Sequence, residues 1–185
     1  RALLSFFSLI SIPLGSLGSV TTKFVADYTG RGKTQTASLL VTQLVVLCVV
    51  ISLVIICSFL YFPAIKQFLG IEDAILLGLV GVNISLATIN EVYRGAFRGW
   101  QFFKFLSFII VFESILKLVG AWIVGITGWD LRNTVFSITL ASLISLLAST
   151  IFLSPNLRSK SHEAPEYQKI LRYFIPTLIV AFHSA

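Results

Sequence analysis

The feature that most constrains this chain is a series of long apolar segments separated by short polar connections. A helix needs about 20 apolar residues to cross the ~30 Å hydrocarbon layer of a bilayer. Five segments reach that length, and a sixth begins near the end of the chain. They run from about Ala2 to Thr22, Ala37 to Phe62, Ile75 to Arg94, Phe105 to Ile126 and Asn133 to Leu153, with the sixth starting near Ile170. The expected fold is therefore all-α, a polytopic transmembrane helix bundle.

The composition excludes an ordinary soluble domain. Hydrophobic residues make up 56% of the chain and charged residues only 12%, whereas a soluble domain is about 25% charged because its surface faces water. The net charge of +6 does not indicate a nucleic-acid partner, because the basic residues form short groups between apolar segments and not one charged face. The chain starts and stops inside apolar segments, so we expect a fragment of a longer protein.

The basic residues are divided unequally between the two sides of the expected membrane. Ten of the 14 Lys and Arg residues lie on the side that holds the first, third and fifth connections. They are Lys23, Arg31, Lys33, Arg94, Arg98, Lys104, Arg158, Lys160, Lys169 and Arg172. Three lie on the other side, and Lys117 belongs to neither. Because cytoplasmic connections carry the excess of Lys and Arg, the sequence predicts a multi-pass protein of the cell membrane with these connections in the cytoplasm.

Two charged residues, Glu113 and Lys117, lie near the middle of the fourth apolar segment. Either charge alone would cost about 2.5–3.5 kcal/mol at the centre of a bilayer. Four residues apart, with the acid first, they lie one helical turn apart and can form an ion pair. They either line a polar cavity, where they contact a substrate or relay protons, or pin one helix against its neighbour. We favour the cavity, because Ser or Gly would satisfy a packing role at lower cost.

The third apolar segment carries a polar stripe. Asn83, Asn90 and Arg94 share one helical face with Ala87, at offsets of four, seven and eleven residues. The asparagines could bind sugar hydroxyls or phosphate oxygens, or hydrogen-bond to a neighbouring helix. Arg94, partly neutralised by Glu91 three residues earlier, is interpreted first as an anchor at the cytoplasmic end of the helix.

Serine residues also recur on one face of the fifth segment, at Ser142, Ser145 and Ser149. We interpret them mainly as small residues that let helices approach closely.

The two histidines, His162 and His183, lack the spacing of metal ligands. We therefore expect no cofactor, no metal site and no enzymatic activity.

Three stretches resemble segments of one family of membrane proteins: TTKFVADYTGRGK, YRGAFRGWQFFKFLSFIIVFESILKLVGAWIV and RYFIPTLIV. The family is that of the polysaccharide-biosynthesis flippases. The first stretch resembles the end of the family's second helix, the second its turn into the fifth helix, and the third the start of its seventh. The matching residues are Lys23, Val25, Ala26, Asp27, Gly30, Arg31 and Gly32, then Gly95, Gly99, Gln101, Phe103 and Lys104, and finally Pro176.

The resemblance places the chain in the multidrug/oligosaccharidyl-lipid/polysaccharide exporter superfamily, in its oligosaccharide flippase branch. It implies a partial N-terminal lobe of a twelve-helix, two-lobe transporter, from helix two to the start of helix seven. Residues 1–153 would then hold five helices of the N-terminal lobe, 154–169 the cytoplasmic connection between lobes, and 170–185 the start of the C-terminal lobe.

The resemblance also implies a function. Such proteins move lipid-linked oligosaccharide or polysaccharide repeat units across the membrane by alternating access, coupled to a proton or sodium gradient. Lys117 would bind the anionic head of the substrate, and Glu113 would couple transport to protons. Further cavity residues would be Asn83, Asn90 and Arg94. A drug or cation antiporter of the same superfamily is the alternative, supported by Glu113. A membrane-embedded glycosyltransferase or ligase would need a large extramembrane loop or a carboxylate cluster, and neither is visible.

Overall fold

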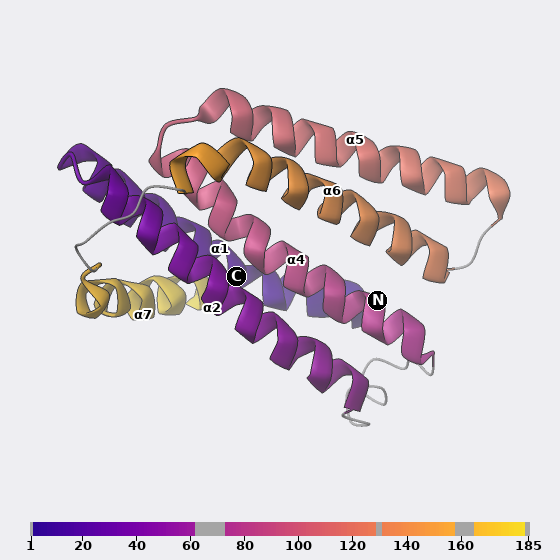
Figure 1. The fold of residues 1–185 in the computed structure, drawn as a ribbon. Helices are drawn as coiled ribbons and strands as arrows, with labels where there is room; N and C mark the ends of the chain where they lie inside the picture. Colours follow the sequence, from indigo (N-terminus) through magenta and orange to yellow (C-terminus); the bar gives the residue numbers. More distant parts are fainter. Residues whose placement is uncertain (1, 62–72, 129–130, 158–164, 184–185) are drawn as a thin grey trace.

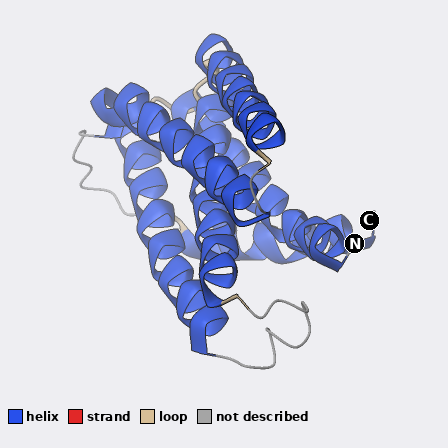
Figure 2. Cartoon of the chain, turned by 90° about the vertical axis from the view of Figure 1, so that its right-hand side faces the viewer, coloured by secondary structure: helices blue, strands red, loops and turns tan. Residues whose placement is uncertain are grey.

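The computed structural model describes residues 2–61, 73–128, 131–157 and 165–183. In the first helix, the side chains are described from Gly15 onward. Every regular element in these ranges is a helix (Figure 2). The helices are α1 (Ala2–Gly30), α2 (Thr34–Tyr61), α4 (Ala74–Gly99), α5 (Phe103–Thr127), α6 (Leu131–Leu157) and α7 (Tyr167–His183). Residues 158–164 of the predicted connection at 154–169, which include Arg158, Lys160 and His162, lie outside the described residues.

Four of the described helices are long and apolar enough to cross a membrane. Their membrane-length parts are Thr34–Phe59, Ala74–Gly99, Phe103–Thr127 and Arg132–Leu157. The predicted all-α bundle and its multi-pass character are thereby confirmed. The first predicted segment is helical as α1, and the sixth is helical as α7, whose 17 described residues are fewer than the roughly 20 of a full crossing.

The helices extend beyond the apolar segments that predicted them. α1 continues to Gly30, where the chain turns through Gly32 at φ +73°, and α4 continues to Gly99, where it turns through Gln101 at φ +61°. Apolar length measures the hydrocarbon layer, whereas backbone hydrogen bonds continue into polar sequence. As a result, Arg94 lies inside α4 and not in the connection after it.

α4 is the central helix of the bundle. It packs against α1, α2 and α6. Half of the residues in its most apolar stretch are buried, against 17% in that of α5. Val80, Val92 and Ala96 of α4 are completely buried. α5 packs chiefly on α6 and lies along the edge of the bundle (Figure 1), so that most of its apolar side chains are free to face lipid.

The ends of the helices that flank the basic connections gather at one end of the bundle. The Ser38 hydroxyl of α2 donates to the carbonyl of Asn156 in α6 at 2.5 Å. The backbone N–H of Glu166, just before α7, donates to the Tyr28 hydroxyl of α1 at 2.9 Å. The turn from α4 into α5 lies at the same end (Figure 1). The described basic connections therefore share one side of the bundle, as the sequence predicted.

α1 and α4 cross so closely that glycines are required. A Cβ atom added to Gly95 would lie 2.5 Å from the carbonyl oxygen of Gly18 and 2.8 Å from the Cβ of Thr21, and one added to Gly99 would lie 2.6 Å from the Cβ of Val25. The Thr22 hydroxyl also donates to the Gly95 carbonyl at 3.2 Å. Small residues of this kind let two membrane helices bring their backbones into contact.

Gly95→Ala is expected to destabilise the protein by about 1–3 kcal/mol, because the backbone of α1 must move away from the added methyl group. The matched control is Gly125→Ala in α5, where an added Cβ meets nothing within 4 Å. It should leave the stability unchanged or slightly raised, because alanine favours the helix. Thermal unfolding of both variants in detergent measures the difference, and equal effects would contradict the close crossing.

Candidate functional site

A polar cavity of about 270 Å³ opens among α1, α4, α5 and α6. Its lining contains all five residues that the sequence singled out, which come from two different helices. The complete lining is Gly15, Asn83, Ala87, Asn90, Glu91, Arg94, Glu113, Lys117 and Ser142. The structure thus brings the stripe of the third predicted segment and the ion pair of the fourth onto the same cavity.

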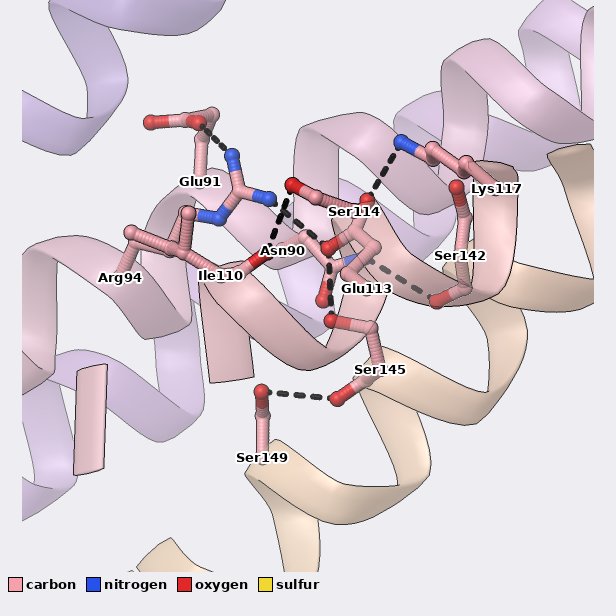
Figure 3. Close-up of polar contacts among 10 residues, drawn as sticks. All are labelled: Asn90, Glu91, Arg94, Ile110, Glu113, Ser114, Lys117, Ser142, Ser145 and Ser149. Carbon is pink, nitrogen blue, oxygen red and sulfur yellow. Dashed lines mark hydrogen bonds and ion pairs between the residues drawn. The ribbon is translucent and has the colours of Figure 1, made fainter. Parts of the chain in front are cut away.

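Glu113 is the centre of the cavity's hydrogen-bond network (Figure 3). The Lys117 ammonium donates to its Oε1 at 2.6 Å, which confirms the predicted pair within α5. Its Oε2 accepts from the Arg94 Nη2 at 2.8 Å and from the Ser145 hydroxyl at 2.7 Å. The side chain is only 6% exposed, so one buried carboxylate connects α4, α5 and α6.

Arg94 bridges two carboxylates (Figure 3). Its Nη1 donates to Glu91 at 2.8 Å, as expected from their spacing in one helix, and its Nη2 donates to Glu113 of the neighbouring helix at 2.8 Å. Three-quarters of the side chain is buried. Its interpretation as an anchor at the end of the helix is therefore wrong, because the side chain points into the bundle.

The charges of the network cancel. Glu91 and Glu113 supply two negative charges, and Arg94 and Lys117 supply two positive ones. Room for the Glu91 carboxylate comes from Gly18 of α1, where a Cβ would lie 2.9 Å from its Oε2. Charges inside a membrane are tolerated when they are paired in the interior of the bundle, and this network meets that condition.

Two residues of the lining each have a buried donor without a partner among the described residues. Asn83 Nδ2 and Arg94 Nε are buried without a partner within the described structure, and Lys117, 39% exposed, has an ammonium with three protons. Asn90 instead donates to the carbonyl of Ser142 in α6 at 3.2 Å, which fits the interhelical role of asparagine. A ligand rich in acceptor oxygens would complement these donors.

Ser145 is the site residue that the sequence did not reveal. The serine face of α6 predicted close packing, and Ser142, Ser145 and Ser149 are all buried. The Ser149 hydroxyl donates to the Ser145 carbonyl of its own helix. The Ser145 hydroxyl, which is completely buried, reaches Glu113 of another helix instead. Helical spacing shows which residues share a face, but it does not show which neighbouring helix that face meets.

The described residues contain no group of three or more His, Cys, Asp or Glu that could hold a metal ion. No protein family, curated protein or solved structure matches this chain. The resemblance to the flippases therefore stays a prediction, and the geometry of the cavity is the basis for a functional proposal.

Proposed function

We propose that this chain belongs to a membrane transporter that moves lipid-linked oligosaccharide or polysaccharide repeat units across the cytoplasmic membrane by alternating access. The observation that carries the proposal is a cavity beside the membrane-length helices α4, α5 and α6 that is lined by Arg94, Lys117 and Asn83. Within the described structure, the Arg94 Nε and the Asn83 Nδ2 have no partner. Intramembrane ionisable residues that face a cavity are typical of substrate pathways.

The chemistry of such a substrate fits the cavity. A sugar diphosphate head cannot enter hydrocarbon, because burying an unpaired charge is very costly. Guanidinium and ammonium groups form charge-assisted hydrogen bonds to phosphate oxygens, and amide groups can bind sugar hydroxyls. The lipid tail can stay in the bilayer, next to the exposed apolar side chains of α5, such as Ile115 and Leu118.

The proposal is tested by reconstituting the protein in liposomes with a fluorescent, diphosphate-linked polyprenyl sugar. We expect the protein to bring the probe from the inner leaflet to the outer one, where an external quencher reaches it. Fluorescent phosphatidylcholine, which has no diphosphate, is the control and should remain protected. Equal movement of both lipids, or of neither, would contradict a transporter for lipid-linked sugars.

The proposal places the basic end of the bundle in the cytoplasm. Single cysteines at two exposed positions test this orientation, with the exposed Cys57 replaced by Ser. Gln35→Cys lies at the start of α2, at the basic end, and Ile75→Cys lies at the start of α4, at the opposite end. In intact cells a membrane-impermeant maleimide is expected to label Ile75→Cys only. Labelling of Gln35→Cys in intact cells would show that the orientation is reversed.

A further inference from the structure

We propose that Glu113 occupies the place of the substrate's anionic group, and that an oxyanion binding to Arg94 and Lys117 displaces its carboxylate. The inference rests on the proposed function for the nature of the ligand. It adds that the site is closed by one of its own side chains, so that binding is an exchange of one anion for another.

The first argument is the convergence of donors on Glu113. A guanidinium from α4, an ammonium from α5 and a hydroxyl from α6 all donate to this one carboxylate, at 2.8, 2.6 and 2.7 Å. The two cations are groups that bind phosphate, whereas the Ser145 hydroxyl is completely buried, does not line the cavity and holds the Glu113 carboxylate in place. Glu113 therefore holds the position with the strongest attraction for an anion in this cavity.

The second argument is that a larger oxyanion can make more hydrogen bonds than Glu113 does. Asn83 and Arg94 line the same cavity, and Glu113 leaves Asn83 Nδ2 and Arg94 Nε without a partner in the described part of the chain. A diphosphate has more acceptor oxygens than a carboxylate, so it could satisfy these donors as well. Lys117, at 39% exposed, is the most open member of the network and gives an incoming anion access to it.

The third argument concerns the consequence of the exchange. Arg94 keeps Glu91 as a partner when Glu113 leaves, so the exchange does not leave the guanidinium without a counter-ion. α5 itself packs chiefly on α6, and the ion pair between Arg94 and Glu113 ties it to α4. Binding of the anion would therefore loosen α5 from the central helix, which couples occupancy of the cavity to helix packing.

The test is titration of inorganic diphosphate into the protein in lipid nanodiscs, followed by calorimetry. Glu113→Gln keeps the size and one acceptor oxygen of the side chain but releases the two cations, and it should bind diphosphate at least about tenfold more tightly than the wild type. Ser145→Ala leaves every charge in place and removes only one hydrogen bond that holds the carboxylate. It should bind about threefold more tightly.

Glu91→Gln is the matched control, because it removes a carboxylate from the same arginine but leaves Glu113 on Lys117. Its affinity should rise less than that of Glu113→Gln. The inference is overturned if neither Glu113→Gln nor Ser145→Ala binds more tightly, if Glu91→Gln has as large an effect, or if the wild type and all variants fail to bind. If Glu113→Gln does not fold, the affinity of Ser145→Ala for diphosphate decides whether the inference holds.

A second titration, with farnesyl diphosphate, separates this inference from the proposed function. Tighter wild-type binding of farnesyl diphosphate than of inorganic diphosphate supports a lipid-linked ligand. The opposite order contradicts the transport proposal, while the ranking of the variants still tests the displacement of Glu113. Transport by the wild type without tighter binding by the variants would overturn the displacement alone.

Discussion

Replacing Arg94 by alanine is expected to destabilise the protein by about 3–5 kcal/mol, the cost typical of breaking a buried ion pair by removing one partner. The substitution leaves Glu91 without the ion pair observed here and takes one of the two cations from Glu113. Arg31→Ala is the matched control, because Arg31 forms an ion pair of 2.9 Å with Asp27 whose side chains are 55% and 41% exposed. That substitution should cost less than about 1 kcal/mol.

Denaturant unfolding in detergent measures both variants, and a double-mutant cycle identifies the cause. Adding Glu91→Gln to Arg94→Ala removes the unpaired carboxylate, so it should recover part of the lost stability. A loss for Arg94→Ala no larger than that for Arg31→Ala would show that the network is solvated and contributes little to the fold.

The fold could be predicted from the sequence because lipid imposes a simple rule. Backbone groups in hydrocarbon must be satisfied within a helix, so the length of an apolar run predicts a helix and its approximate place. The rule does not locate helix ends, and α4 continues five residues beyond the predicted boundary at Arg94, to Gly99. Because the predicted boundary falls at Arg94, the sequence places this residue at a helix end, whereas it lies in the interior of α4.

The candidate site could be predicted only as far as one helix determines it. The period of 3.6 residues placed Asn83, Asn90 and Arg94 on one face, and the spacing of four residues paired Glu113 with Lys117. The ion pair between Arg94 and Glu113 depends on how two helices are rotated against each other. No pattern within a single helix contains that information.

Part of the family resemblance is also explained by helix packing. Gly95 and Gly99, which carry part of the likeness, are needed where α1 and α4 cross, since a Cβ at either position would meet α1. Residues that suggested a family therefore also have a packing reason that any bundle with such a crossing would share. Evidence for transport must come from the cavity, whose charged residues are harder to explain by packing alone.

Lys117→Ala should show whether the charged residues of the cavity serve transport or only helix packing. It is expected to reduce translocation of the lipid-linked probe by about tenfold or more, because the cavity loses one of its two cations while Glu113 keeps its negative charge. Insertion and folding should change little, since Lys117 is 39% exposed and Glu113 retains Arg94 and Ser145.

Lys104→Ala is the matched control, because Lys104 is an exposed lysine near the start of the same helix and does not line the cavity. It should leave both transport and the yield of folded protein unchanged. Transport is normalised to the amount of folded, membrane-inserted protein in each case. If Lys117→Ala loses folded protein and transport in equal proportion, the pair with Glu113 serves to hold α5 in place. If transport falls while folded protein is retained, the ammonium acts on the ligand, because a helix that is still correctly packed has lost only its charge toward the cavity.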